Sequence, residues 1–99
     1  MNYTHPMNFE WDEIKSDACL QRRGFDFAYA AKAFFDPNRI IAIDDRRDYG
    51  EERFRLTGMI KGRLYVVAYT PRDGAIRIIS AHKANQREIR RYEDSTYED

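Results

Sequence analysis

Basic residues in the second half of this chain have the types and spacing that bind phosphate groups. Lys83, Arg87 and Arg91 recur at i, i+4 and i+8, which would align them along one face of a helix. Arg53 and Arg55 alternate and therefore share one face of a strand. The guanidinium group binds phosphate through paired, charge-assisted hydrogen bonds. The helical residues alone would fit an ordinary solvated face, but together with the strand arginines they favour a surface for nucleic acid.

Charge is distributed unevenly along the chain, although the net charge is zero. Residues 1–45 hold five basic and eight acidic residues, whereas residues 46–92 hold twelve basic and five acidic ones, a net charge of +7. Residues 93–99 hold four acidic residues and no basic one. This asymmetry predicts a surface that faces a polyanion, together with an acidic tail.

Several other chemistries are not supported by the sequence. It contains no glycine-rich phosphate loop, no paired cysteines with zinc spacing and no cofactor motif, so we expect neither a metal nor a cofactor. Cys19 has no histidine close to it in sequence and is more typical of a buried residue than of a nucleophile. A single cysteine, with no long apolar run and no signal segment, predicts a cytoplasmic protein.

The 99 residues are enough for one domain with a modest core. Hydrophobic periodicity and turn residues predict an α+β fold of order β-α-α-β-β-β-β-α, in which an antiparallel sheet packs against two N-terminal helices and a C-terminal helix. The expected strands are residues 7–11, 39–44, 53–60, 63–69 and 76–80, and the expected helices are residues 13–23, 27–35 and 82–92. Residues 1–6 are expected to form a loose extension, residues 7–92 the domain and residues 93–99 the acidic tail.

Details of the two N-terminal helices follow from the residue types. Asp12 and Asp26 can cap their first turns, and Pro37 would end the second helix. The first helix is expected to bury a stripe of Trp11, Ile14 and Ala18, with Trp11 in the core. The second is expected to bury an apolar face, which consists of Phe27, Ala30, Ala31 and Phe34. In the strand 63–69, Tyr65 and Tyr69 share a face and would either stack on bases or belong to the core.

Five stretches resemble, in order, the BrnT family of toxins from bacterial type II toxin–antitoxin pairs. They are "FEWDEIK", "RRGFDF", "GEERFRLTG", "GRLYVVAYT" and "IRIISAHKANQREIRRYE", within residues 7–93. The resemblance implies a RelE-like ribonuclease fold, cleavage of RNA that arrests translation, and neutralisation by a cognate antitoxin. That antitoxin would be a DNA-binding, ribbon-helix-helix protein of the BrnA type that represses the operon together with the toxin.

The family's residues carry over unevenly. Family members commonly have Lys-His just before the glycine that is Gly24 here, and this chain has Arg22 and Arg23 at those two positions. They commonly have an Asn where this chain has Cys19. An Arg-Arg or Arg-Lys pair is replaced by His82 and Lys83. The residues that stand as in the family are Lys15, Glu51, Glu52, Arg53, Arg63, Arg77, Ser80, Arg87, Glu88 and Tyr92.

Metal-free RNA cleavage needs a base, an acid and cations that stabilise the pentavalent phosphorane. The predicted catalytic residues are Glu51, Glu52, Arg53, Arg77, His82 and Lys83, and the predicted RNA-binding residues are Lys15, Arg22, Arg23, Arg55, Arg63, Arg87 and Arg91. One of the two glutamates would be the base, and His82 would replace the missing family histidine. Two alternatives stay open: His82 only caps the helix that follows it, or the protein binds RNA or its antitoxin without cleaving RNA.

Overall fold

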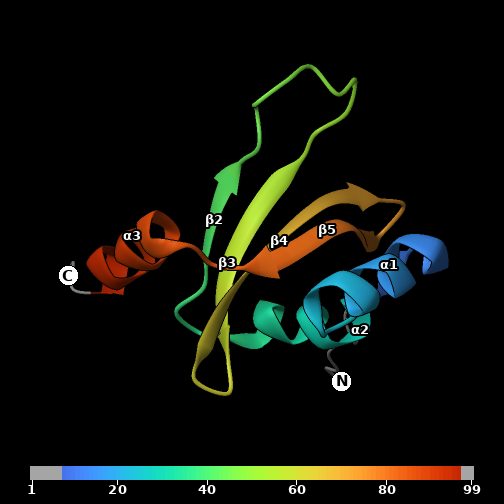
Figure 1. Cartoon of the computed structure of the whole chain (residues 1–99). Helices are drawn as coiled ribbons and strands as arrows, with labels where there is room; N and C mark the ends of the chain where they lie inside the picture. The colour runs from blue at the N-terminus through green and yellow to red at the C-terminus, as the bar shows by residue number, and fades with distance from the viewer. Residues whose placement is uncertain (1–7, 97–99) are drawn as a thin grey trace, which may run out of the picture.

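The computed structural model describes residues 8–96, which form a five-stranded sheet with helices on both of its faces (Figure 1). The elements in chain order are β1 (Phe9–Trp11), α1 (Glu13–Arg23), α2 (Phe27–Ala30), the 3-10 helix η1 (Ala31–Phe35), β2 (Ile40–Ile43), β3 (Phe54–Ile60), β4 (Arg63–Arg72), β5 (Ala75–Lys83) and α3 (Gln86–Thr96). The expected α+β architecture is therefore confirmed. The expected extension at residues 1–6 lies outside the described residues.

The sheet has the strand order β1-β5-β4-β3-β2. Strands β2 to β5 form the expected antiparallel meander, whereas β1 pairs in parallel with β5 and makes the sheet mixed. Two tight turns join β3 to β4 and β4 to β5. Lys61 and Gly62 occupy the first turn with φ of 49° and 83°, and Asp73 and Gly74 the second with 50° and 80°. These left-handed values explain why glycine stands at both turns.

The first helix is capped as expected, but the predicted buried stripe is wrong. Oδ1 of Asp12 accepts from the backbone N–H of Ile14 at 2.9 Å, and Gly24 ends the helix with φ of 85°. The buried residues of α1 are Ser16 and Cys19, and the side chain of Ile14 is 79% exposed. Two helical steps rotate Ile14 by about 200° from Ser16, so both cannot face the core. Trp11 packs against the core from β1 instead.

The expected second helix divides into α2 and η1. Oδ1 of Asp26 caps it by accepting from the backbone N–H of Tyr29 at 2.9 Å. All four residues of its expected apolar face are buried. The helix tightens to 3-10 geometry and ends at Asp36, whose ψ of 118° is the extended conformation favoured before proline. It packs so closely on β3 that a Cβ at Gly58 would lie 2.4 Å from the carbonyl oxygen of Ala33.

The last helix begins later and ends later than expected. It spans Gln86–Thr96, so His82 and Lys83 belong to β5 and the first four residues of the expected acidic tail are helical. Lys83 therefore does not align with Arg87 and Arg91 along one face of a helix. Tyr92 is buried and donates its hydroxyl hydrogen to Oδ2 of Asp36 at 2.6 Å, which attaches α3 to the segment after η1.

The core lies between the sheet and the N-terminal helices. Its largest fully buried side chains are Leu56, Val67 and Ile78, one from each of the three central strands. Tyr65 and Tyr69 are both buried here, which confirms the core alternative for these two residues. At the sheet's open edge, β2 leaves a patch of exposed apolar side chains beside η1. This edge patch consists of Phe35, Ile41 and Ile43, which are 66%, 51% and 68% exposed.

Candidate nucleic-acid interface

The face of the sheet opposite α1 and α2, here called the outer face, carries the candidate functional groups in rows across the strands. Residues paired across strands project to the same side. One row consists of Ala42, Arg55, Ala68 and Ser80, and the next consists of Ile40, Thr57, Val66 and His82. Arg55 and His82 therefore lie on the same face in neighbouring rows.

A bulge in β5 brings Arg77 to this same face. Ala68 pairs with Ser80, but the next residue of β4, Tyr69, pairs with Ile78, so β5 contains one extra residue. Arg77 then pairs with Thr70, two residues beyond Ala68, and shares the outer face with Ser80 although the two are three positions apart. Regular alternation would have placed Arg77 and Ser80 on opposite faces.

Arg53 is held at the same end of the sheet by the loop that precedes β3. Its Nε donates to Oε2 of Glu51 at 3.0 Å, and its guanidinium lies 3.9 Å from the centre of the Tyr49 ring. The loop itself is fixed because Thr70 donates its hydroxyl hydrogen to the backbone oxygen of Glu52 at 2.6 Å. Since Thr70 pairs with Arg77, Arg53 and Arg77 lie at one end of the outer face.

Arg55 occupies the middle of the outer face with an unsatisfied donor. Its Nε is buried without a hydrogen-bond partner among the described residues and lies 4.0 Å from Oδ1 of Asp44. That carboxylate is already engaged by Arg46, whose Nε and Nη2 donate to it at 2.6 and 2.9 Å. The hydrogen bond from Arg46 holds the pKa of Asp44 below its ordinary value, and the charges of Arg46 and Arg55 add to this effect. A buried guanidinium N–H without an acceptor favours an anionic ligand.

A cavity of about 240 Å³ lies between this face and α3, with Arg55, Glu88 and Arg91 among its lining residues. Strands β2, β3 and β4 supply the remaining wall, and Ser95 closes it from α3. Opposite charges from two elements therefore meet at one hollow on the outer face.

His82 is connected to α3 through Glu88. Nε2 of His82 lies 3.1 Å from Oε1 of Glu88, which also accepts from the backbone N–H of Asn85 at 2.9 Å. In return, Oδ1 of Asn85 accepts from the backbone N–H of Glu88 at 2.9 Å, so Asn85 and Glu88 form a capping box. Burial raises the pKa of Glu88, but the hydrogen bonds from Asn85 and His82 outweigh it, and the pKa lies below its ordinary value.

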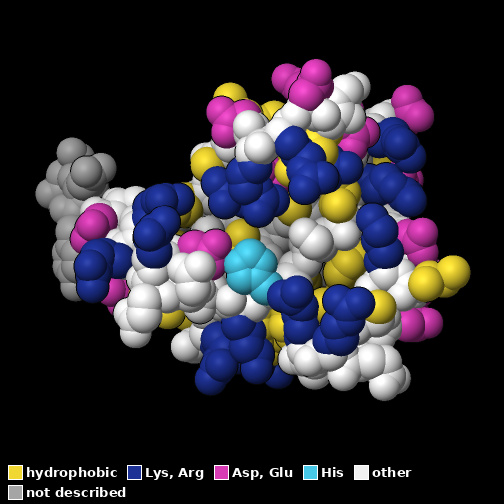
Figure 2. Space-filling model, turned by 45° about the horizontal axis from the view of Figure 1, so that its top comes forward, with side chains coloured by type: hydrophobic (Ala, Val, Ile, Leu, Met, Phe, Trp, Pro, Cys, Tyr) yellow, Lys and Arg dark blue, Asp and Glu magenta, His cyan; other side chains and the backbone are white. Residues whose placement is uncertain are grey.

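Three predicted RNA-binding residues of α1 lie beside β5. Lys15, Arg22 and Arg23 line a cavity of about 200 Å³ that also includes Ser80 of the outer face. Figure 2 shows the face that carries the histidine, in cyan, with dark-blue lysine and arginine side chains on several sides of it. Basic side chains of β3, β5 and α3 thus lie on or beside the outer face, and those of α1 lie beside β5.

Other predicted residues do not join this group. Lys83 follows His82 directly on β5, and its Cα partner is the core residue Tyr65, so its side chain projects to the opposite face. Arg63 begins β4 at the far hairpin, about 23 Å along the strand from Thr70. Arg87 is exposed on α3 beside Arg90 and Arg91, outside the cavity that Arg55 lines.

The predicted glutamates also lie far from the histidine. Thr70 contacts the backbone of Glu52, and Val66 pairs with His82. These two residues of β4 are four positions apart, which is about 13 Å along the strand. A base and an acid that act on one phosphate must both reach it within about 3 Å. Glu51 pairs with Arg53 at the Thr70 end of the outer face, whereas His82 pairs with Glu88 at the Val66 end.

Two residues of the site, Glu88 and Tyr49, were not among the predicted site residues. The sequence did carry a signal for Glu88, since Asn85-x-x-Glu88 is a capping-box pattern next to a histidine. The ring of Tyr49 under Arg53 follows from a loop conformation that no periodicity indicates. Cys19 is buried, and burial raises the pKa of its thiol, as expected of a residue outside the chemistry.

The fold and the site define a small α+β protein with an open sheet face suited to binding phosphate groups. Within residues 8–96 no three metal-ligating side chains cluster, and no helix there is long and apolar enough to cross a membrane. The family model described as "Ribonuclease toxin, BrnT, of type II toxin-antitoxin system" matches residues 11–88, so the chain belongs to the BrnT family. No curated protein matches the chain. The family prediction from the sequence is confirmed.

Proposed function

We propose that this protein is a toxin that cleaves RNA on the outer face of its sheet and thereby stops translation. Membership of a family of ribonuclease toxins supports the reaction class. The observation that carries the proposed site is the unsatisfied Nε of Arg55, which lies one row from His82 on the outer face. A phosphate in the cavity that Arg55 lines would accept from the exposed part of this guanidinium, whose side chain is 28% accessible, and Glu88, which lines the same cavity, contacts His82.

In the proposed reaction, the 2′-hydroxyl oxygen attacks the neighbouring phosphorus, and the bond to the 5′-oxygen breaks. His82 accepts the proton of the 2′-hydroxyl, because histidine exchanges protons near neutral pH. Glu88 orients the ring, and Arg55 offsets the charge of the phosphorane. The leaving 5′-oxygen takes its proton from the imidazolium or from water, and the products carry a 2′,3′-cyclic phosphate and a 5′-hydroxyl.

Arg53 and Arg77 bind adjoining phosphates in this proposal, about four residues of strand away from His82. Glu51 balances the charge of Arg53 and is not the base, which departs from the interpretation of the sequence alone. Lys15, Arg22 and Arg23 extend the basic surface past Ser80. Since arginine side chains supply the positive charge that the transition state needs, the reaction requires no metal ion.

The purified protein should cut single-stranded RNA in the presence of excess EDTA and leave 2′,3′-cyclic phosphate ends. Mass spectrometry of the fragments identifies these ends directly. Cleavage that appears only with added Mg²⁺ or Mn²⁺ would contradict the mechanism. Tight binding without any cleavage would instead support the alternative that the chain is a binding module. The presence of Arg23 at a position where the family commonly has histidine favours that alternative.

We further propose that the toxin acts in the cytoplasm, where a BrnA-like, DNA-binding antitoxin of the ribbon-helix-helix class neutralises it in a hetero-oligomer. The type II family supports a protein antitoxin as partner. The edge patch of Phe35, Ile41 and Ile43 lies along an unpaired strand edge, which is a surface that partner chains commonly cover. Ile43→Lys should therefore weaken co-purification with the product of the neighbouring gene, while Ile14→Lys, on the exposed side of α1, should not.

A further inference from the structure

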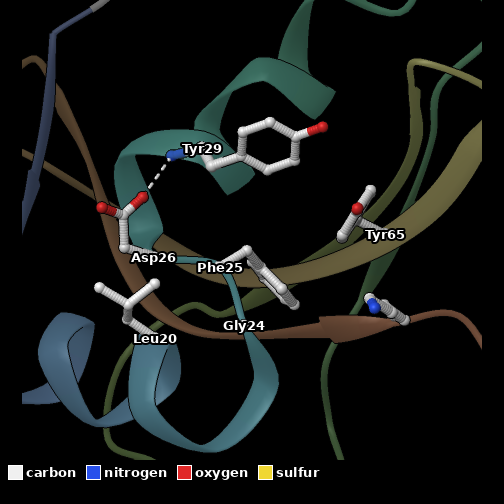
Figure 3. Close-up of a pocket in the computed structure, with 7 residues that line it drawn as sticks. Leu20, Gly24, Phe25, Asp26, Tyr29 and Tyr65 are labelled. Carbon is white, nitrogen blue, oxygen red and sulfur yellow. Dashed lines mark hydrogen bonds between the residues drawn. The ribbon is translucent and has the colours of Figure 1, made fainter.

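A cavity of about 360 Å³ lies on the helix-covered side of the sheet, away from the outer face. It is lined by Leu20, Gly24, Phe25, Asp26, Tyr29, Tyr65 and Lys83 (Figure 3). Its volume falls within the range of about 300–1,000 Å³ that is usual for small-molecule sites. The functional site described above uses none of these residues.

The cavity has an aromatic floor and an apolar rim. The ring centroids of Phe25 and Tyr65 lie 5.0 Å apart, and those of Tyr29 and Tyr65 lie 5.7 Å apart, both in edge-to-face arrangements. Phe25 and Tyr65 are buried, whereas Leu20 at the C-terminal end of α1 is 45% exposed. An exposed leucine beside buried aromatic rings offers apolar surface to a flat, unsaturated ligand.

Two charged groups give the cavity polarity. Oδ1 of Asp26 accepts from the backbone N–H of Tyr29, as the dashed line in Figure 3 shows, and Oδ2 accepts no hydrogen bond within residues 8–96. Lys83 is exposed and supplies an ammonium group. The cavity therefore combines aromatic carbon, a cation for phosphate and, at its side away from Tyr65, the second carboxylate oxygen of Asp26 as an acceptor for an amino group (Figure 3). These are the groups that would bind the base and the phosphate of a nucleotide.

The cavity is adjacent to the outer face around the edge of β5. Lys83 and His82 are consecutive residues, with Cα atoms about 3.8 Å apart and side chains on opposite faces. β1 pairs with β5 only at Ile76, Arg77 and Ile78, so no strand covers the edge of β5 beside His82. Helix α1 lies against β5 as far as Ala81, where Sγ of Cys19 donates to the backbone oxygen at 3.7 Å, so an RNA strand would pass around the edge at His82 and Lys83, beyond this contact.

From this arrangement we infer that the cavity binds one unpaired nucleobase of the RNA, next to the cleaved phosphate, and prefers a base with an exocyclic amino group. This inference rests on the proposed function, since it assigns a subsite for the same substrate. Lys83 contacts the phosphate of that nucleotide, and Oδ2 of Asp26 accepts from the amino group of cytosine or adenine, which uracil lacks. The prediction of Lys83 as a catalytic residue is replaced by this binding role.

Binding can be measured apart from cleavage with 2′-deoxy oligonucleotides, which lack the attacking hydroxyl. Leu20→Glu places a negative charge at the cavity, and Ile14→Glu places the same charge elsewhere on α1, at a residue that is 79% exposed. We expect fluorescence anisotropy to show affinity reduced by about fivefold or more for Leu20→Glu, as for the loss of one stacked base, and nearly unchanged for Ile14→Glu. Equal affinity of the two variants would overturn the inference.

Asp26→Asn tests the base preference, because asparagine also caps helices but offers an amide hydrogen where the carboxylate offers an oxygen. The wild type should bind oligo-deoxycytidine more tightly than oligo-deoxyuridine, and this preference should fall or reverse in Asp26→Asn. An unchanged preference would contradict the inference. If Leu20→Glu loses antitoxin binding and keeps oligonucleotide binding, the cavity belongs to the protein interface instead. The proposed ribonuclease fails on a different result, which is absence of cleavage by a protein that still shows these binding preferences.

Discussion

Nε2 of His82 lies 3.1 Å from Oε1 of Glu88 and thereby joins the last strand to the last helix. The same carboxylate closes the capping box of α3 with Asn85. The orientation of the imidazole and the start of the helix therefore depend on one side chain. The capping alternative for His82 and its proposed part in cleavage do not exclude each other, because the ring is still about one-third exposed, with 36% of the side chain accessible.

Glu88→Gln separates these two functions, since glutamine can also complete a capping box. We expect the variant to keep its fold, with a modest fall in melting temperature at pH 7 because the ionised carboxylate of Glu88 stabilises the folded state. It should lose about tenfold or more in cleavage rate, because the imidazolium loses its carboxylate partner. His82→Gln should lose at least as much, and the double variant should be no slower than His82→Gln alone. Single-turnover rates with a short RNA give the comparison. Additive losses in the double variant would show that Glu88 acts independently of His82.

Arg53→Ala and Arg77→Ala should each slow cleavage strongly, while Arg63→Ala serves as the matched control. The first two remove cations from one end of the outer face, whereas Arg63 lies at the far hairpin. Because Arg53 and Arg77 bind phosphates next to the cleaved one, each loss should weaken RNA binding by about tenfold or more, as expected for one charge-assisted hydrogen bond, and should slow cleavage at low RNA concentration. Growth arrest in expressing cells and RNA cleavage in vitro measure the effect, with circular dichroism as the check on folding. An Arg63→Ala variant as impaired as the other two would move the site toward the hairpin.

Tyr92→Phe should lower the free energy of unfolding by about 1–3 kcal/mol, because it removes a buried hydrogen bond to a carboxylate. Oδ2 of Asp36 would retain only the N–H of Met59, at 2.7 Å. Burial, together with the bond to Asp36, raises the pKa of Tyr92 to about 12, so the hydroxyl is a donor throughout the neutral range. Urea denaturation at pH 7 gives the difference. An unchanged midpoint with an unchanged slope would show that the bond does not stabilise the attachment of α3.

Stability should fall as the solution is made acidic. The pKa values of Asp44, Asp36 and Glu88 all lie below their ordinary values of 3.8, 3.8 and 4.5. Arg46 lowers that of Asp44; for Asp36, burial acts in the opposite direction but is outweighed by hydrogen bonds, chiefly from Tyr92. At acidic pH the folded state thus binds fewer protons than the unfolded state. The stabilisation by these carboxylates is complete above about pH 4.5 and is lost as the pH falls through their lower pKa values in the folded state.

Thermal unfolding followed from pH 7 to pH 2 measures this loss. Asp44→Asn should show a lower melting temperature at pH 7 and a shallower decline, because one of the three titrating carboxylates is absent. A melting temperature of the wild type that stays constant from pH 5 to pH 2 would contradict the linkage.

Local chemistry in the sequence determined much of the framework. The aspartate caps at Asp12 and Asp26, the turn glycines and the alternation of β3 each act within a few residues of chain, so their consequences can be predicted without a fold. The family and the α+β architecture could be predicted for the same reason, since both depend on ordered local motifs.

Only the tertiary structure decided which of these residues meet. Periodicity gives the relative faces of neighbouring residues but not which face the helices cover, and so Ile14 was wrongly placed in the core and Lys83 on a helix. Arg77 joins Ser80 and His82 because of one extra residue in β5, a bulge set by pairing with β4 rather than by local preference. A bulge reverses the alternation beyond it, and its position depends on how two strands fit together in space. The composition of the outer face was therefore fixed by long-range register, which short-range patterns in a single sequence do not determine.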